Sequence, residues 1–216
     1  RSSISFQYKH NAGQETRIDP SVSNIVDIYM LERTYDNLFR IWSQDGGVKP
    51  LTSTSDQLRI NYSGTLNPLK SLSDQIVYHP VKYKILFGAN ADEQLQATFK
   101  VVKNTKTNVT DAVIKTRVIA AVNEFFALDN WDFGDTFYFT ELAAYVHNQL
   151  APDLLTAVIV PNQAGQGFGS LFQINSASDE IFISGATVDD VSIITVKHTG
   201  SPGAERFTGE IGRLHR

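Results

Sequence analysis

The chain has 216 residues, of which 42% are hydrophobic and 19% are charged, so its length and composition fit one large folded domain or two small ones and exclude a disordered chain. Its formal net charge of -4, from 19 basic and 23 acidic residues, argues against a general nucleic-acid binder, because neutralising phosphates requires a concentrated basic surface. The sequence holds no cysteine, which excludes disulfides and thiolate metal sites, and no apolar run approaches the roughly 20 residues that span a membrane.

Residues 1–24 are polar and rich in turn-forming residues, and we expect them to form an arm or connector with one short strand. The chain begins with Arg1, and its one methionine is Met30. We therefore expect it to be a fragment of a longer protein.

Residues 25–75 are predicted to form a small α/β segment. Its first part, 25–31, combines β-branched and aromatic residues as strands do, and 37–42 has the apolar spacing of a short helix. An exposed loop that could serve for insertion or docking is predicted over 44–56, because this stretch holds two consecutive glycines, a proline and several hydroxyl residues. The leucines of 66–76 recur at helical intervals, which predicts a second helix.

Residues 76–196 are predicted to form the core domain, which opens with strands at 81–87 and 96–102 joined by a turn at 89–93. Its strongest feature is a helix over 109–128, in which apolar residues recur at three- and four-residue steps, so that one face is buried. These apolar residues are Val113, Ile114, Val118, Ala121, Val122, Phe125 and Phe126.

Asn108 is predicted to cap this first central helix and Thr140 to cap a second one, because side-chain oxygens of both residue types accept hydrogen bonds from free backbone N–H groups. The second helix follows a turn at 131–135 and must end before Pro152, since the proline ring cannot continue a helix. A strand rich in β-branched residues is predicted next, at 155–160.

Further strands are predicted at 171–174, 181–183 and 191–196, after a glycine-rich loop at 165–169. Strands grouped around two packed helices predict an α+β fold, with mixed or antiparallel sheets packed against a pair of central helices. Periodicity is lost over 197–216, which predicts a flexible or partner-ordered tail.

Six short motifs of the core domain follow one another with a distinctive spacing. They are Asn123-Glu124-Phe125-Phe126, Trp131-Asp132-Phe133-Gly134-Asp135, Glu141-Leu142, the apolar strand into Pro161, Phe172-Gln173-Ile174 and Asp179-Glu180-Ile181-Phe182. In this order they resemble the carboxyl-terminal part of the baseplate wedge proteins of T-even-like contractile-tailed phages and, more broadly, the baseplate J-like family. The resemblance covers residues 20–196 and is strongest over 109–190. None of the motifs is a catalytic signature.

The resemblance implies a structural protein of the virion, a wedge subunit that is assembled in the host cytoplasm and forms ring contacts around the tail tube. It also implies a homodimer that contacts other wedge proteins and rearranges as a rigid body when the sheath contracts. Accordingly, we expect no catalytic residue, no cofactor, no metal, no nucleic-acid partner and no membrane insertion. The candidate interface residues lie in the second helix region and the tail, and they are Phe137, Tyr138, Phe139, Tyr145, His147, Leu150 and Phe207.

Three patterns could carry chemistry, but each lacks part of the arrangement that the chemistry needs. The glycines of 165–169 follow a strand without the lysine and hydroxyl residue of a P-loop or the third glycine of a dinucleotide site. The histidines are scattered, and His147 lies six positions after Glu141, on a largely different helix face. The pairs Asp179-Glu180 and Asp189-Asp190 would point to opposite faces of a strand, which favours turn acids or partners of basic residues.

Two other functions stay open at the level of sequence. A receptor-binding or adaptor domain of a virion would need a solvent-facing aromatic groove. A ligand-binding enzyme domain that uses the 165–169 loop ranks last, because no catalytic constellation is assembled.

Overall fold

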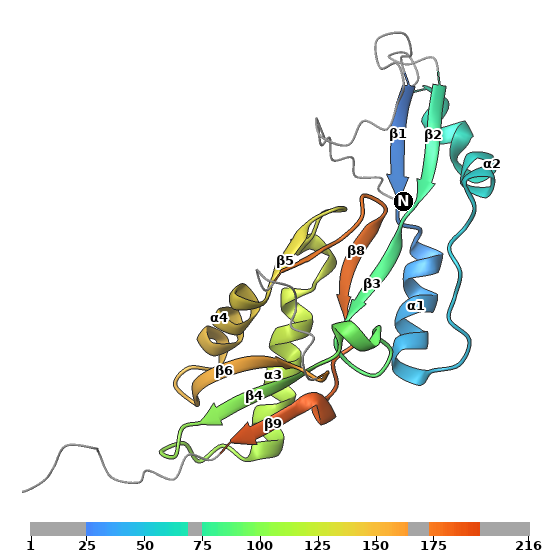
Figure 1. Cartoon of the computed structure of the whole chain (residues 1–216). Coiled ribbons are helices and arrows are strands. Elements are labelled where there is room, and N and C mark those ends of the chain that lie inside the picture. Colours follow the sequence, from blue (N-terminus) through green and yellow to red (C-terminus); the bar gives the residue numbers. More distant parts are fainter. Residues whose placement is uncertain (1–24, 69–74, 164–172, 195–216) are drawn as a thin grey trace, which may run out of the picture. The chain divides into compact units, whose positions relative to one another are not determined.

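A computed structural model describes residues 25–68, 75–163 and 173–194 (Figure 1). The fold is α+β, as predicted, with four helices and sheets that combine parallel and antiparallel strands. The chain divides into two compact units. The first unit contains the described residues up to Lys84, Trp131–Asp135 and Asn175–Phe182, and the second contains Ile85–Asn130, the described residues of Thr136–Ile174, and those from Ile183 onward.

The first unit contains a pair of parallel strands with a helix packed against it. Strand β1 (Ile25–Met30) pairs with β2 (Gln75–Pro80), and α2 (Ser55–Leu66) packs against β2 (Figure 1). The core of this layer is formed by Leu58 and Leu66 of the helix and by Tyr78 of the strand. β1 confirms the strand predicted over 25–31.

Of the helix predicted over 66–76, residues 69–74 lie outside the described residues. At its two ends, α2 stops at Leu66 and Ile76 lies in β2, so the predicted boundaries differ from the observed ones. The signal that places α2 is a capping box at its start. The Thr54 hydroxyl accepts a hydrogen bond from the Gln57 amide at 3.3 Å, and the Gln57 side chain accepts one from the Thr54 amide at 2.9 Å. Such reciprocal bonds satisfy N–H groups that the helix itself leaves free.

The other helix of the first unit, α1 (Arg33–Asp45), is longer than the predicted 37–42. It ends at Gly46, whose φ of +75° is a conformation that glycine adopts without strain. Tyr35 and Phe39 are its buried residues. The loop predicted over 44–56 is confirmed for the residues between α1 and α2.

The second unit is built on a three-stranded mixed sheet in the order β6–β4–β9. Strand β4 (Ala97–Lys103) lies between β6 (Leu154–Pro161), to which it is antiparallel, and β9 (Val191–Ile194), to which it is parallel. Helices α3 (Asp111–Phe125) and α4 (Phe139–Leu150) pack against each other and against this sheet (Figure 1). The predicted pair of central helices is therefore present.

Both predicted helix caps are wrong. α3 is capped by Thr110, whose hydroxyl accepts a hydrogen bond from the Val113 amide at 3.4 Å, and Asn108 precedes that cap. Thr140 lies inside the first turn of α4, because the buried Phe139 already begins the helix directly after β5 (Thr136–Tyr138).

An aromatic cluster fills the core of the second unit. The ring of Phe87 lies 5.0 Å from that of Phe99 and within 6.2 Å of those of Phe126, Phe137 and Phe139. All five side chains are buried. The faces of these rings meet edges, which is the favourable arrangement of aromatic quadrupoles.

The remaining strands form two short pairs. β3 (Lys82–Leu86) pairs with β8 (Glu180–Ser184), and β5 pairs with β7 (Gln173–Asn175). The 3-10 turns are η2 (Glu93–Leu95), η3 (Leu128–Asn130) and η4 (Val188–Asp190). The strands predicted at 81–87, 96–102, 155–160 and 181–183 are thus confirmed within one or two residues.

Some predictions lie outside the described residues, namely the arm at 1–24, the glycine-rich loop at 165–169 and the tail at 197–216 with Phe207. Within the described ranges, no helix has the length and apolar character that crossing a bilayer requires.

Candidate functional site

The turn Trp131–Asp135 packs on the segment Asn175–Phe182 within the first unit. The rings of Trp131 and Phe182 meet edge to face at 5.2 Å, and the Gly134 amide donates to the carbonyl of Glu180 at 3.3 Å. Gly134 has a φ of +78°, and a Cβ there would lie 3.5 Å from the Ser178 backbone. A side chain would be in ordinary contact there, so it is the positive φ that favours glycine at this position.

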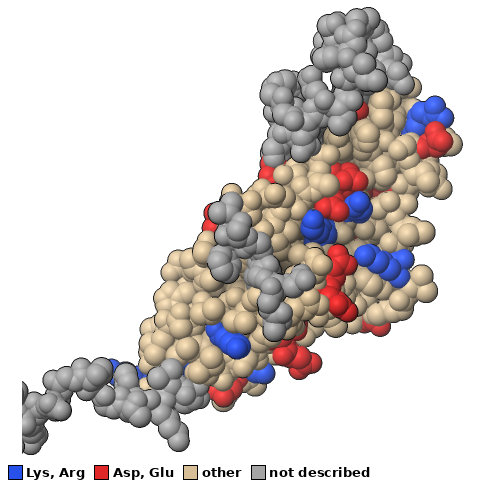
Figure 2. All heavy atoms as spheres, viewed as in Figure 1, with Lys and Arg blue, Asp and Glu red and all other residues tan. Residues whose placement is uncertain are grey.

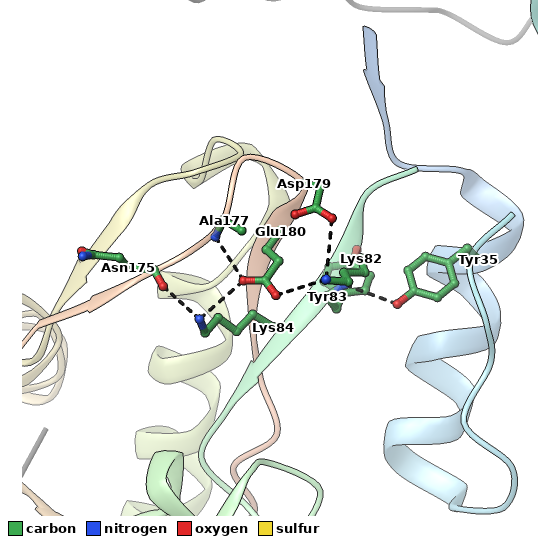
Figure 3. A network of polar contacts seen from close by, with 8 residues as sticks. All are labelled: Tyr35, Lys82, Tyr83, Lys84, Asn175, Ala177, Asp179 and Glu180. Carbon is green, nitrogen blue, oxygen red and sulfur yellow. Dashed lines mark hydrogen bonds and ion pairs between the residues drawn. The ribbon is translucent and has the colours of Figure 1, made fainter. Parts of the chain in front are cut away.

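One face of β3 carries an ion-pair cluster with the residues before and at the start of β8 (Figure 3). Lys82 Nζ lies 3.6 Å from a carboxylate oxygen of Asp179 and 3.6 Å from one of Glu180. Lys84 Nζ lies 3.4 Å from the other Glu180 oxygen and donates to the carbonyl of Asn175 at 2.9 Å. Lys82 and Lys84 point the same way because side chains two apart on a strand share a face.

Glu180 is the centre of this cluster. Burial disfavours its charged form, but the hydrogen bond from the Ala177 amide at 3.1 Å and the charges of Lys84 and Lys82 outweigh burial and lower its pKa. The carboxylate is therefore ionised and holds the turn before β8 against β3.

We expect Glu180→Gln to lower the free energy of unfolding by about 1–2 kcal/mol near neutral pH, because charge-assisted hydrogen bonds are weakened. The pKa of Glu180 is lower in the folded chain than the usual 4.5, so its ionisation stabilises the fold above that value and the contribution is lost as the pH falls through the folded pKa. Urea unfolding at several pH values should show the difference between variant and wild type shrinking below about pH 4.5.

The matched control is Asp179→Asn. This change removes a single ion pair, to Lys82, from a carboxylate that is more exposed than that of Glu180, so it should have a smaller effect on the free energy of unfolding. A Glu180→Gln effect that stays constant down to about pH 3 would contradict the role assigned to the charge.

The opposite face of β3 carries Tyr83, which packs among aromatic side chains of α1. Its ring lies 4.8 Å from that of Phe39 and 5.9 Å from that of Tyr35. Its hydroxyl donates to Asp36 Oδ1 at 2.6 Å, and Arg40 Nε donates to the same oxygen at 2.6 Å. This second cluster fixes α1 against β3.

Burial and the hydrogen bond to the Asp36 carboxylate raise the pKa of Tyr83, and burial raises the pKa of Tyr35 despite the hydrogen bond that its oxygen accepts from the Tyr83 amide. Both phenols are therefore neutral; the Tyr83 hydroxyl donates to Asp36, and the Tyr35 oxygen accepts from the Tyr83 amide. The Asp36 carboxylate accepts hydrogen bonds from the Tyr83 hydroxyl and the Arg40 guanidinium. The acidic and basic side chains of the two clusters are therefore paired with one another. Chemically, the arrangement stabilises the packing of α1, β3 and the turn before β8.

A metal site, a pocket or a charged patch would be another kind of functional site among the described residues. No group of three metal-ligating side chains comes together in this part of the chain. A shallow depression of about 250 Å³ lies between α3 and α4, lined by side chains that include Arg117, Glu124 and Gln149. Figure 2 shows basic and acidic side chains in small mixed groups on the described part of one face, rather than in a large patch of one sign.

Three of the predicted interface residues lie in the core of the second unit. Phe137 and Phe139 are buried with their rings 4.8 Å apart, and Leu150 is buried at the end of α4. Their side chains pack inside the unit, so these three residues do not lie on its surface as the interface prediction requires. Figure 1 shows the end of β5 leading directly into α4, which explains why both phenylalanines turn inward.

Three others reach the surface. Tyr138 is 40% exposed, Tyr145 is half-buried with its ring 5.4 Å from that of Phe125, and His147 is half-buried. The structure does not bring Tyr145 and His147 together, because residues two apart on a helix do not face each other. His147 Nδ1 is buried and has no hydrogen-bond partner. Among the described residues, His147 belongs to no group of three or more side chains that could hold a metal ion.

The clusters on β3 were missed at the level of sequence. The sequence favours Asp179-Glu180 as turn acids or as partners of basic residues across an interface, and it does not identify Lys82 and Lys84, which lie far from this pair in the chain. The spacing of Asp36 and Arg40 was a usable signal, since an acid and a base four positions apart pair on a helix.

No protein-family model matches the chain, and no curated protein matches it significantly. The resemblance to baseplate wedge proteins therefore stays a prediction.

Proposed function

We propose that the chain is a structural subunit of a phage tail baseplate wedge, which forms ring contacts around the tail tube and rearranges when the sheath contracts. The observation that carries this proposal is the order and spacing of the aromatic and acidic motifs between residues 109 and 190. The proposed location is the tail baseplate of the virion.

The packing of the motif residues supports a mechanical role. The motifs that contain Trp131 and Phe182 are about 50 positions apart, and within the first unit the two rings meet while the Gly134 amide donates to the carbonyl of Glu180. The acidic motif Asp179-Glu180 pairs with two lysines of β3. Contacts of this kind stabilise the folded unit, which is what a subunit needs if it is to transmit force and move as a rigid body.

The loop between α1 and α2 supports contacts with partner subunits. Val48 is 94% exposed and Leu51 is 91% exposed, although both side chains are apolar. Large exposed apolar side chains in one short loop favour a binding surface. We assign this loop, residues 46–54, to contacts with other wedge proteins.

The test is co-expression of the chain with the other wedge proteins of its phage, followed by affinity purification and electron microscopy of the complexes. The wild-type chain should enter ring or wedge assemblies. The double variant Val48→Ser and Leu51→Ser should keep the wild-type melting temperature and lose at least tenfold in binding, because each side chain contributes buried apolar area only in the complex.

Ile60→Ser is the matched control, since Ile60 is an exposed apolar residue of α2 outside this loop. A wild-type chain that binds none of the wedge proteins would overturn the proposed function. If the double variant binds the wedge proteins as tightly as the wild type, the loop is not part of the interface.

A further inference from the structure

Strand β6 is an unusual edge strand. It has eight residues, Leu-Leu-Thr-Ala-Val-Ile-Val-Pro, none of them charged, and within the described residues it pairs on one side only, with β4. Leu155 is 55% exposed and Val158 is 50% exposed. Folded proteins usually protect such edges with charges, interior prolines or short strands, because unpaired backbone groups invite another strand.

The register identifies which backbone groups of β6 face outward. The Asn162 amide donates to the carbonyl of Gln96 at 3.0 Å, and antiparallel pairs alternate between hydrogen-bonded and non-bonded positions. The bonded positions of β6 are therefore Thr156, Val158 and Val160, opposite Val102, Lys100 and Thr98. Ala157 and Ile159 consequently direct their N–H and C=O groups to the open edge.

We propose that this edge binds the same edge of a second copy of the chain, antiparallel and around a two-fold axis at Val158. Ala157 of one copy then lies opposite Ile159 of the other, and the two residues exchange both backbone hydrogen bonds. The two three-stranded sheets become one continuous sheet. This inference rests on the proposed function as a baseplate wedge subunit, for which the resemblance implies a homodimer, and it places the dimer contact on β6 rather than on α4.

The side chains of the strand favour a second copy over a different partner. In this register Val158 faces Val158, and Thr156 faces Val160, so β-branched side chains meet across the axis. β6 offers no charge that would select or orient a charged partner strand. Its own sequence is complementary to itself in the antiparallel direction.

One strand pair is a small interface compared with the roughly 1,200–2,000 Å² of stable complexes, so we expect a reversible dimer rather than an obligate one. Sedimentation equilibrium of the full chain should show a monomer–dimer equilibrium. Val158→Lys should weaken the dimer at least tenfold, because it places two like charges opposite each other on the axis. Val113→Lys, at an exposed position of α3, should leave the equilibrium unchanged.

Cysteine cross-linking gives an independent measurement, because the natural chain has no cysteine. In Val158→Cys, the two sulfur-bearing residues would face each other at a non-bonded position with Cα atoms about 4.5 Å apart, close enough for a disulfide. Leu155→Cys is similarly exposed, but the register separates its two copies by six residues, or about 20 Å. Mild oxidation should therefore link Val158→Cys much faster than Leu155→Cys.

A strictly monomeric wild-type chain, or equal cross-linking at the two positions, would overturn the inference. Dimerisation that is indifferent to Val158→Lys would also overturn it, yet would leave the proposed function standing on another surface. A β6 dimer that binds no wedge protein would support the inference and remove the proposed function.

Discussion

Replacement of Gly88 by alanine is expected to lower the free energy of unfolding by more than about 3 kcal/mol. Gly88 has a φ of +71°, and a Cβ there would lie 1.9 Å from the carbonyl oxygen of Gly185. That oxygen belongs to the backbone, which cannot move aside as the end of a side chain can. The Gly185 amide also donates to the carbonyl of Leu86 at 2.9 Å, so relieving the overlap would break this hydrogen bond.

The measurement is urea unfolding followed by circular dichroism, with Gly64→Ala as the matched control. Gly64 lies in α2, and a Cβ there would meet no atom within 4 Å. Alanine at this helical position should raise the free energy of unfolding by about 0.5–1 kcal/mol. A Gly88→Ala variant as stable as wild type would show that the segments around Gly88 and Gly185 move apart more easily than their contacts indicate.

Replacement of Phe137 by alanine is expected to lower the free energy of unfolding by about 3–5 kcal/mol. Its ring is fully buried and lies 5.2 Å from that of Phe126 and 4.8 Å from that of Phe139. Truncation removes these ring contacts and leaves a cavity that the surrounding aromatics fill only in part. The same urea titration measures the change.

Tyr138→Ala provides the control, because the neighbouring side chain is partly exposed and its loss should cost less than about 1 kcal/mol. The pair of variants also separates a core role from an interface role. If Phe137→Ala kept the stability of the wild type and lost self-association instead, Phe137 would belong to an interface after all.

The two central helices could be predicted because their apolar periodicity reports directly on burial. In α3 the periodic residues Ile114, Val118 and Val122 are buried, as expected, whereas Val113, predicted on the same face, is 42% exposed. α2 was missed because only Leu58 and Leu66 of its twelve residues are buried, which leaves almost no periodic pattern. The leucine spacing beyond it predicted a helix that extends to 76, whereas Gln75 and Ile76 already belong to β2, which pairs with β1.

Strand partners were beyond prediction from a single sequence. The strand β4 lies between β6 and β9, which follow it at very different distances along the chain. Local alternation identifies which residues of a strand share a face, but it carries no information about which other strand completes the ladder. The ion pairs of β3 depend on this kind of long-range pairing, and so they appeared only in the structure.

The predicted interface residues show a related limit of prediction from sequence. An aromatic run such as Phe137, Tyr138 and Phe139 has the composition of an interface and of a core equally. The burial alternates, with the two phenylalanines inside and the tyrosine outside. Reading the run as the end of a strand, with a period of two, would have separated them.

The discontinuous first unit imposes an order on its folding during synthesis. Lys84 and Glu180 are 96 positions apart in the chain. At about 5–20 residues per second, the ribosome needs on the order of 5–20 s to deliver the carboxylate after the lysine has been made. Strand β3 and the ring cluster of α1 therefore emerge well before Trp131–Asp135 and Asn175–Phe182, with which they share the unit. A nascent chain stalled before Asn175 would present this unfinished surface to chaperones, so the first unit is completed only after the segment Asn175–Phe182 has been made.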